Sequence, residues 1–529
     1  MNCSRQILLV LVTTLVSYSV ATGREIPGKT AINVLFIAVD DLRPELGCYG
    51  AAHVHSPNID ALAAGGMVFD RAYCQQAVCN PSRASIMTGL RPDTLQVWTL
   101  GVDFRTKMPN AVTIPHHFAK HGYRTVNIGK VFHNIFPDEV SWTDPVMYVD
   151  GFPFDPDAVY AGEQELAWLE NRKAELIAAG KDKQRIDKFG QWYLKASATE
   201  SADVPDNANY DGAQTDVAIE KLAELAADEK PFFFGIGYYR PHLPFNAPKK
   251  YWELYDRDAI PLATNPGLTK DAPLMAINTM RELRGGYYDF ANSLRPDEGS
   301  LDEARQRLLK HGYLASVSYV DAQIGRLMKQ LEDLGIADST IVVLWSDHGW
   351  KLGEHNSWCK MTNYEIDARV PLIVRAPGMA KAGSRCNALV ELVDVFPALC
   401  EMTNQPVPEN LEGTSFAPLL ADPDRDGKAA VFHQFLREGI WTAPNGIEYM
   451  GHAIRTDQHR YVRWVTWPEK KSAAEELYDL TEDPSEMINV ASREENAALL
   501  AELRERLDRG YRSAFPNVDE NQRESSNHE

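Results

Sequence analysis

The sequence predicts an α/β fold, in which a sheet is covered by helices on both faces, followed by a smaller C-terminal α+β subdomain. Two observations lead to this prediction. Short apolar runs alternate with helical patterns between residues 32 and 402, and the pattern changes after Gly427. The chain also has 529 residues, more than the roughly 250 to 300 at which one hydrophobic core stops growing. We therefore expect a main domain over residues 24–427 and a C-terminal subdomain over 428–515.

Five apolar runs have the length and composition of fully buried parallel strands. They are INVLFIAVDD (32–41), YRTVNIGKVFH (123–133), PFFFGIGYYRPH (231–242), STIVVLWSDHGW (339–350) and VPLIVRAPG (370–378). Helical patterns lie between or after these runs, at 113–121, 213–226, 313–334 and 389–402. The third pattern carries an apolar stripe that includes Val317, Ile324 and Leu331. We expect this stripe to face the sheet.

Side chains capable of chemistry follow four of the predicted strands. In chain order they are Asp40, Asp41, Lys130, His133, His242, Asp347 and His348. Each one alone has an ordinary explanation as a cap or a loop residue. In a sheet of this kind, however, ligands bind beyond the carboxyl ends of the strands, so we expect these side chains to meet there. Adjacent carboxylates at 40 and 41 repel each other unless a cation lies between them. A hard divalent ion, Ca²⁺ or Mg²⁺, suits such oxygen ligands.

The segment CNPSR (79–83) predicts the start of a helix. Pro81 suits the first helical position, the helix continues to Thr88, and Gly89 suits its end. Cys79 then lies just before the helix, where backbone N–H groups favour an anion. Arg83 lies one turn on, where its guanidinium can bind the same anion. A structural role is the common alternative for a lone cysteine. Because six cysteines remain after residue 23, Cys79 as one half of a disulfide is a further alternative.

Both chain ends predict segments that do not belong to the fold. Residues 1–23 combine Arg5, a short apolar run and small residues up to Ala21, a pattern typical of a signal peptide. We therefore expect export, to the periplasm or out of the cell. The apolar run is too short for a membrane span, and we expect none elsewhere. A net charge of −20 argues against nucleic acid or an anionic membrane as a partner. Residues 516–529 are polar and are expected to be disordered.

The C-terminal subdomain contains recognisable elements of its own. Residues 451–467 (GHAIRTDQHRYVRWVTW) predict a hairpin, 476–484 (ELYDLTEDP) a strand and turn, and 493–511 an amphipathic helix. Residues 160–198, in the main domain, are charged and helical in pattern. There we expect a solvated covering helix, with a substrate-gating insertion as the alternative.

The chain resembles the sulfatase family over about residues 30–490. CNPSRASIMTG (79–89) matches the signature C-x-P-S-R followed by T-G, whose cysteine is oxidised to formylglycine. The other matching motifs, in sulfatase order around it, are VDD (39–41), GKVFH (129–133), RPHLPF (240–245) and SDHGWKLGEHNSWCK (346–360). The last three, with ELYDLTEDPSEMINV (476–490), are most similar to the iduronate-2-sulfatase branch. The resemblance implies an alkaline-phosphatase-like fold, with a large, mixed, mostly parallel sheet sandwiched by helices, and makes residues 24–427 the catalytic domain.

The resemblance also implies roles for the matching residues. Ca²⁺, with Mg²⁺ as the alternative, would be held by Asp40, Asp41, Cys79, Asp347 and His348. The sulfate group would be surrounded by Arg83, Lys130, His133, His242 and Lys360. Trp350 follows the fourth strand end and is a candidate for stacking on a sugar ring, although a large aromatic beside a site is as often part of its wall.

The implied reaction is hydrolysis of a sulfate ester. Cys79 would be converted to formylglycine (3-oxoalanine) by a formylglycine-generating enzyme, which is therefore an implied maturation partner. One hydroxyl of the hydrated aldehyde would attack sulfur, and His242, with Lys360 as the alternative, would protonate the departing sugar oxygen. His133 would take the proton of the second hydroxyl as sulfate leaves. The implied substrate is a sulfated sugar of a polysaccharide or glycosaminoglycan, a 2-O-sulfated uronic acid by the branch.

Two other functions stay open at this point. A phosphate or phosphonate ester hydrolase of the same superfamily would use the same kind of anion pocket. An inactive relative would bind sulfated glycans without hydrolysing them. Loss of Cys79 or of a metal ligand would favour the inactive relative, and the sequence shows neither loss.

Overall fold

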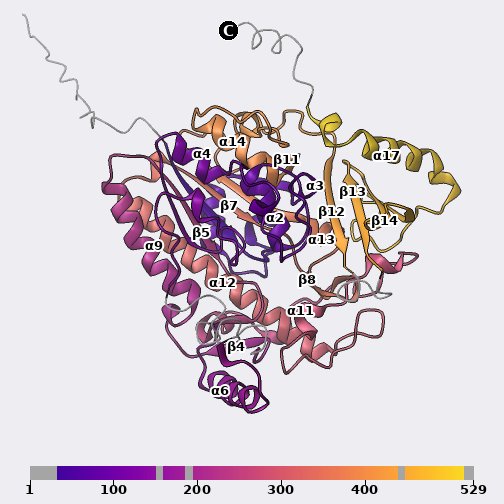
Figure 1. Ribbon diagram of the computed structural model, residues 1–529, viewed down its shortest axis with the longest axis horizontal. Helices are drawn as coiled ribbons and strands as arrows, with labels where there is room; N and C mark the ends of the chain where they lie inside the picture. The colour runs from indigo at the N-terminus through magenta and orange to yellow at the C-terminus, as the bar shows by residue number, and fades with distance from the viewer. Residues whose placement is uncertain (1–31, 150–158, 185–194, 439–446, 517–529) are drawn as a thin grey trace, which may run out of the picture.

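The computed structural model describes residues 32–149, 159–184, 195–438 and 447–516. The predicted signal peptide and residues 517–529 of the predicted tail lie outside this part of the chain. A seven-stranded sheet forms the centre of the molecule (Figure 1). Its order is β11 (Ser384–Glu391), β2 (Met67–Tyr73), β10 (Arg369–Arg375), β7 (Thr340–Ser346), β1 (Asn33–Val39), β5 (Phe232–Tyr238) and β3 (Arg124–Gly129).

The sheet is mixed but mostly parallel, which confirms the expected fold class. β7, β1, β5 and β3 pair in parallel, as does β11 with β2. The prediction that residues 370–378 form another parallel strand is wrong, because β10 runs antiparallel to both β7 and β2. The chain leaves β7 at the carboxyl edge, stays there through residues 347–368 and enters β10 from the same edge. It must therefore run back across the sheet.

Two strands and one boundary differ from the sequence prediction. β2 contains Asp70 and Arg71, and β11 begins with the polar stretch Ser-Arg-Cys-Asn, so neither has a continuous apolar run. The predicted helix 389–402 begins in the wrong place. Its first three residues belong to β11, and the helix itself, α14, spans Val395–Met402.

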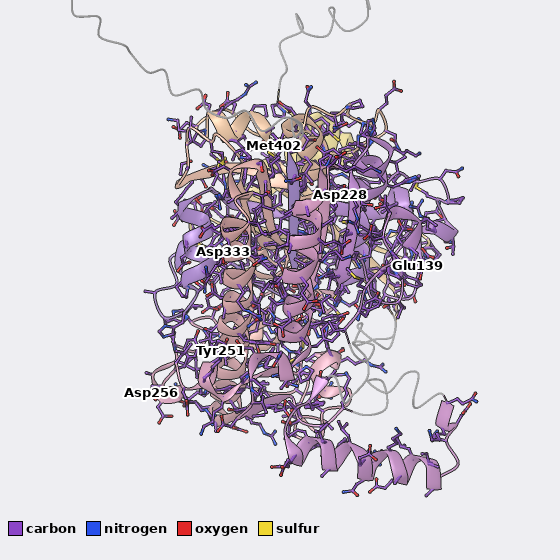
Figure 2. The ribbon with its side chains drawn as sticks, turned by 90° about the vertical axis from the view of Figure 1, so that its left-hand side faces the viewer. Glu139, Asp228, Tyr251, Asp256, Asp333 and Met402 are labelled. Atoms are coloured by element: carbon purple, nitrogen blue, oxygen red, sulfur yellow. The ribbon has the colours of Figure 1, made fainter. Side chains whose placement is uncertain are left out.

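Helices cover both faces of the sheet, as expected. α1 (Pro57–Ala64), α9 (Tyr210–Ala227) and α12 (Glu303–Asp333) pack on one face, and α2 (Cys79–Thr88), α4 (Ile114–Lys120) and α14 pack on the other. Figure 2 shows α9 and α12 side by side. Along β1, Leu35 and Ile37 face the first set, whereas Val34 and Phe36 face the second. Each such burial stabilises the fold by about 1.5–3 kcal/mol.

Two helices differ in extent from the sequence prediction. α12 begins ten residues before 313, where the side chain of Asp302 accepts a hydrogen bond from the Arg305 N–H and caps it. α6 (Glu163–Ala178) lies within the charged region 160–198, and Leu169 is its one buried residue. It stands out from the body of the molecule (Figures 1 and 2), so it is solvated as expected but covers little. Residues 185–194 of that region lie outside the described residues.

A four-stranded antiparallel sheet forms the C-terminal subdomain, beside the first sheet (Figure 1). Its strands are β12 (Val431–Arg437), β13 (Tyr449–Arg455), β14 (His459–Thr466) and β15 (Ser472–Asp479). The predicted hairpin is β13 with β14, and the predicted terminal helix is α17 (Ala497–Arg509). Leu500 and Leu503 of α17 pack on Ile454 and Leu477 of the sheet. β12 has no counterpart in the prediction.

Buried charges join the two sheets. Glu391 ends β11, and its carboxylate accepts hydrogen bonds from Lys428 (2.6 Å), from Arg91 (2.7 Å) and from the N–H of Phe432 (3.0 Å). Lys428 also donates to Asp394 at 2.6 Å. Because all these side chains are almost completely buried, removing one partner leaves an uncompensated charge in the interior.

We predict that Lys428→Met lowers the free energy of unfolding by about 3–5 kcal/mol, the cost of leaving Glu391 and Asp394 without their shared cation. Chemical denaturation followed by fluorescence measures the change. The matched control is Lys249→Met, because the Lys249 side chain is 50% exposed and its loss is expected to change stability by less than about 0.5 kcal/mol. Equal stability of the two variants would contradict the prediction.

Candidate active site

The register of the central strands brings the predicted site residues to one edge of the sheet. Val39, the last residue of β1, pairs with Ser346 of β7 and with Tyr238 of β5. The residues that follow therefore leave the sheet at the same level. The N–H of Asp41 donates to Asp347 Oδ1 at 3.2 Å, which ties the two strand ends together.

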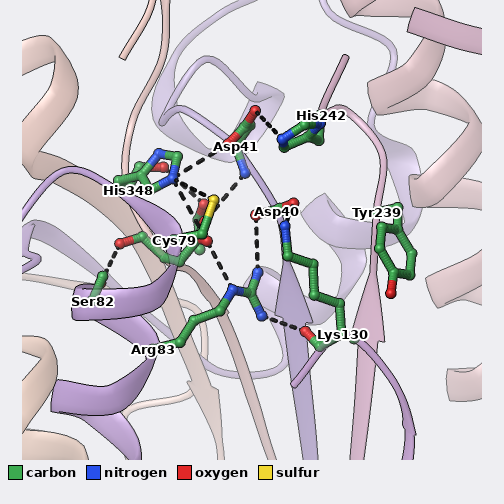
Figure 3. A network of polar contacts seen from close by, with 12 residues as sticks. Asp40, Asp41, Cys79, Ser82, Arg83, Lys130, Tyr239, His242 and His348 are labelled. Atoms are coloured by element: carbon green, nitrogen blue, oxygen red, sulfur yellow. Dashed lines mark hydrogen bonds and ion pairs between the residues drawn. The ribbon is translucent and has the colours of Figure 1, made fainter. Parts of the chain in front are cut away.

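Helix α2 brings Cys79 to the same edge (Figure 3). Cys79 is the first residue of α2, two positions earlier than predicted, and Gly89 ends the helix in the left-handed conformation with φ of 66°. The Ser82 hydroxyl donates to the carbonyl oxygen of Asp347 at 2.5 Å and fastens the helix to the end of β7. The side chain of residue 79 is therefore held next to the carboxylates of Asp40, Asp41 and Asp347.

Four predicted ligands converge on one point. Ligand atoms of Asp40, Asp41, Cys79 and His348 lie within 4.8 Å of one another, and all four residues are buried. The Nε2 atom of His348 lies 3.3 Å from Asp41 Oδ1, 3.5 Å from the Cys79 sulfur and 3.6 Å from Asp347 Oδ2. Calcium binds oxygen at about 2.3–2.6 Å, so opposite ligands stand about 4.6–5.2 Å apart. The donor set and its spacing fit such an ion.

Arg83 lies beneath these carboxylates (Figure 3). Its Nε donates to Asp347 Oδ2 at 2.8 Å, its Nη2 to Asp40 Oδ1 at 3.1 Å, and its Nη1 to the backbone carbonyl oxygens of Lys130 and Val131. The side chain is fully buried. The structure therefore places Arg83 as a support for the carboxylates, whereas the sequence placed it around the sulfate.

The two adjacent aspartates have opposite electrostatic surroundings. Burial alone would raise the pKa of Asp40, but the ion pairs with Lys130 and Arg83 outweigh it and hold this pKa well below its usual range. Burial raises the pKa of Asp41 well above its usual range, against the opposing effect of Lys360. The negative charge of Asp40 raises it further. The groups around Asp41 therefore supply too little positive charge to compensate its carboxylate, and a bound cation would supply the rest.

A second cluster lies on the other side of Asp41. Lys360 Nζ donates to Asp41 Oδ1 at 2.8 Å and to Glu282 Oε1 at 3.0 Å. His242 Nε2 lies 2.9 Å from the same Glu282 oxygen, and its Nδ1 lies 2.6 Å from the Leu243 carbonyl oxygen. Because a carbonyl only accepts, Nδ1 carries a proton, and Nε2 faces the carboxylate. Burial lowers the pKa of His242, Lys360 lowers it further, and Glu282 opposes them.

Glu282 has no signal in the sequence. It lies in the four-residue helix α11 (Arg281–Arg284), far from every motif. Burial alone would raise its pKa, but Lys360 and His242 outweigh this effect and hold it well below the usual range. Glu282 is therefore negatively charged, and both His242 and Lys360 contact its carboxylate.

Two predicted residues lie at the edges of the site. His133 Nδ1 is buried and has no hydrogen-bond partner among the described residues. Burial lowers the pKa of His133, and Lys130 and Arg83 lower it further, so the ring is neutral and able to accept a proton. Trp350 is only 1% exposed and lies 4.9 Å from Lys360 Nζ, measured to the ring centroid. It has no open face for a sugar ring, so the structure places it in the wall.

The loop that carries His242 is fixed by hydrogen bonds to Asp211 of helix α9. Asp211 of α9 accepts hydrogen bonds from the N–H groups of Tyr239 (2.9 Å) and Arg240 (2.8 Å). Arg240 donates in turn to the carbonyl oxygen of His242 at 2.5 Å. These bonds fix the direction in which the His242 ring leaves β5. Like Glu282, Asp211 has no signal in the sequence that marks it for this position.

Cys79 is a poor nucleophile in its unmodified form. Burial raises the pKa of its thiol to about 12, and the charge of Asp40 adds to this effect against Lys130 and Lys360. The thiolate, which is the reactive form, is therefore scarce near neutral pH. All six cysteines of the described residues are free, so no disulfide accounts for Cys79 there.

The charges of the site leave room for a cation and an anion together. Four carboxylates, those of Asp40, Asp41, Asp347 and Glu282, face three permanent cations, Arg83, Lys130 and Lys360. Counted without the histidines, the cluster carries one excess negative charge. A divalent cation reverses this to one excess positive charge, which a monoanionic ester would neutralise. The residues present therefore fit a metal-assisted reaction of an anionic ester.

Comparison with protein families identifies two matching profiles. The profile described as Sulfatase matches residues 32–405. The profile described as N-sulphoglucosamine sulphohydrolase, C-terminal, matches residues 353–513. The chain is also similar to the iduronate 2-sulfatase of Mus musculus, with 34% identity over 533 residues that cover 90% of this chain and 93% of the relative. For the iduronate 2-sulfatase of Homo sapiens the identity is 34% over 545 residues, covering 91% and 96%.

Solved structures share the fold. A phosphonate monoester hydrolase from Silicibacter pomeroyi superimposes with a TM-score of 0.70 at 24% identity, covering 92% of this chain and 96% of that chain. A protein solved in complex with its substrate D-glucosamine-2-N,6-O-disulfate gives 0.67 at 22% identity, covering 93% and 100%. These likenesses confirm the expected alkaline-phosphatase-like fold, while the chemistry has to be argued from the site.

We predict that Glu282→Gln reduces turnover of a chromogenic sulfate ester by about 10- to 100-fold, because it removes the charge that orients His242 and Lys360. Steady-state kinetics measures the effect, and thermal unfolding shows whether the fold is kept. Glu303→Gln is the control, since Glu303 is exposed at the start of α12 and, among the described residues, pairs only with Arg307. Unchanged kinetics in Glu282→Gln would show that this carboxylate has no part in turnover.

Proposed function

Because the chain belongs to the sulfatase family, we propose that it is a sulfuric ester hydrolase that removes sulfate from a sulfated sugar of a polysaccharide or glycosaminoglycan. One observation carries the proposal: Cys79 of the formylglycine motif lies with Asp40, Asp41 and His348 in one buried group. The named relatives are iduronate 2-sulfatases. We therefore propose a 2-O-sulfated uronic acid as the sugar.

Residue 79 is proposed to act as formylglycine, made by a formylglycine-generating enzyme. The high pKa of the unmodified thiol supports this, since such a thiol is a weak nucleophile. Formylglycine, once hydrated, supplies an oxygen nucleophile and a second hydroxyl. His133 is the proposed acceptor of the proton from that second hydroxyl. Its neutral ring, with an unpartnered Nδ1 among the described residues, suits this role.

Ca²⁺, with Mg²⁺ as the alternative, is the proposed cofactor. It would be held by Asp40, Asp41, Asp347, His348 and residue 79, where it would offset negative charge on the sulfate oxygens and favour deprotonation of the attacking group. Arg83 keeps two of these carboxylates in place. Lys130 and Lys360 add fixed positive charge on the two sides of the aspartate pair.

His242 is the proposed general acid. A sugar alkoxide is a poor leaving group, so the bridging oxygen needs a proton as the S–O bond breaks. The proton on Nδ1 is held by the Leu243 carbonyl, so the proton that is transferred must come from Nε2. Glu282 lies 2.9 Å from Nε2 and favours the protonated ring, against burial and Lys360, which lower the pKa of His242. Lys360, on the same carboxylate, is the alternative donor.

The proposed place of action is outside the cytoplasm, in the periplasm or beyond, as the N-terminal pattern of the sequence predicts. Within the described residues, every helix is too short or too polar to cross a membrane.

The first prediction concerns the modification itself. A peptide that contains residue 79, from aerobically expressed protein, should be lighter than its thiol form by the difference between CH₂SH and CHO. The same protein should hydrolyse a chromogenic sulfate monoester faster than the phosphate monoester of the same alcohol. Peptide mass spectrometry and paired kinetics test both points. Fully active protein with an intact Cys79 thiol, or preference for the phosphate ester, would refute the proposal.

The second prediction concerns the metal. Asp40→Asn should weaken calcium binding and lower sulfate ester turnover by about 100-fold, because it removes a ligand and the anchor of Lys130 and Arg83 together. Calcium titration of chelated protein, followed by calorimetry and by activity, measures both effects. Asp338→Asn serves as the control, since Asp338 is fully exposed. Full activity of the wild-type protein after exhaustive chelation would rule out the proposed role of the metal.

A further inference from the structure

One lysine near Glu282 has no anionic partner among the described residues. Lys195 is partly buried, and it makes no ion pair or side-chain hydrogen bond with the described residues. Its ammonium lies 4.8 Å from the centroid of the Tyr287 ring. Most other lysines of the site region are paired, as Lys130 is with Asp40 and Lys360 with Asp41. A partly buried cation without a counter-ion is costly unless a ligand supplies one.

The surroundings of Lys195 are shaped to hold its side chain. A Cβ atom on Gly286 would lie 2.8 Å from Lys195 Cδ, so the missing side chain at Gly286 makes room for the lysine stem. Backbone bonds fasten the two segments together, because the N–H of Tyr288 donates to the Ala196 carbonyl at 3.2 Å. The Ala198 N–H donates to Asp289 at 3.0 Å. The position of the ammonium is therefore determined by the fold.

Lys195 belongs electrostatically to the leaving-group side of the site. Burial lowers the pKa of Lys195, and Lys360 and Arg281 lower it further, whereas Glu282 raises it. The segment that carries Gly286 and Tyr287 directly follows α11, which carries Glu282. Sulfate is proposed to lie at Cys79, and the departing oxygen at His242. The sugar ring must then extend past Glu282, whose negative charge would repel any further anionic group on that ring.

We infer that Lys195 binds a second anionic group of the substrate, a uronate carboxylate or a second sulfate, next to the leaving-group side of the site. The inference rests on the proposed function and assigns a residue that binds the second anionic group of such a saccharide. The lysine offsets the repulsion by Glu282 and provides a charge-assisted hydrogen bond. A substrate with a single sulfate has nothing for it to bind. Lys195 thus acts on specificity, and the reacting atoms do not require it.

The experiment compares four esters on full-length, calcium-loaded enzyme. They are 4-nitrophenyl sulfate, a neutral hexose monosulfate, a neutral hexose disulfate and a hexuronate monosulfate. The wild-type enzyme should have a higher kcat/KM for one or both dianionic sugars than for the neutral monosulfate. Lys195→Gln should lower that kcat/KM by roughly ten- to a hundredfold, the range for one charge-assisted hydrogen bond. Turnover of 4-nitrophenyl sulfate should stay within about twofold.

Three further variants separate charge from structure. Lys195→Arg keeps the charge and should retain most of the preference. Gly286→Ala should cause a smaller loss of the same selective kind, because its methyl group displaces the lysine stem without changing any charge. Lys329→Gln is the control, since its side chain is 71% exposed and pairs only with Asp333 within the described part of the chain. The two dianionic sugars are then compared for their loss of kcat/KM in Lys195→Gln. A larger loss for the hexuronate identifies the bound group as a carboxylate, and a larger loss for the disulfate identifies it as a sulfate.

Several results would overturn the inference. Equal losses on all four esters would mean a structural role, and no loss on either dianionic sugar would mean no role. A higher wild-type kcat/KM for the neutral monosulfate than for both dianionic sugars would exclude binding of a second anionic group. If the wild-type enzyme turns over none of the sulfates, the proposed function fails, and binding still decides this inference. In that case, calorimetric titration of Cys79→Ser should show tighter binding of the dianionic sugars than of the neutral monosulfate. Adding Lys195→Gln to Cys79→Ser should remove this preference. If the preference is absent or does not depend on Lys195, the inference is refuted.

Discussion

Compensation of buried charge at the carboxyl ends of β1 and β7 is the constraint on which the rest of the site depends. Asp40, Asp41 and Asp347 leave adjacent strands at one level because the register pairs Val39 with Ser346. Three carboxylates without contact to solvent would destabilise the fold unless cations surround them. Arg83 from α2 and Lys130, which directly follows β3, therefore have to reach the same point. The helix that brings Arg83 also brings Cys79, the residue proposed to become the nucleophile after its modification.

The site has two sides with different tasks. On one side, Asp40 is fully compensated by Lys130 and Arg83, and these groups form a rigid base. On the other side, Asp41 shares Lys360 with Glu282, and Glu282 also holds His242. In the proposed reaction, the metal charge acts beside Asp41 and the proton is supplied beside His242. In the proposed reaction, this network of carboxylates and cations separates attack on sulfur from departure of the sugar. Lys195, the inferred site for a second anionic group, lies near Glu282 but is not paired with any member of this network among the described residues.

The second sheet contributes stability and no residue of the site so far described. Its link to the first sheet passes through Glu391, which binds Arg91 and Lys428 in the interior. Such a link depends on all partners being present, because a single buried carboxylate without its cation is strongly unfavourable. The catalytic sheet and the C-terminal sheet are therefore coupled through charge as well as through apolar packing.

The sequence alone determined what local pattern records: the α/β class, four parallel strands, the side chains at their ends, and the motif at Cys79. Apolar runs and strand ends are local, so these were predictable. The direction of β10, the polar strands β2 and β11, the supporting position of Arg83 and the buried place of Trp350 required the tertiary structure. Glu282, Asp211 and Lys195 have no local signal at all. Their roles arise from contacts between segments far apart in the chain, and periodicity within one segment carries no information about its partner.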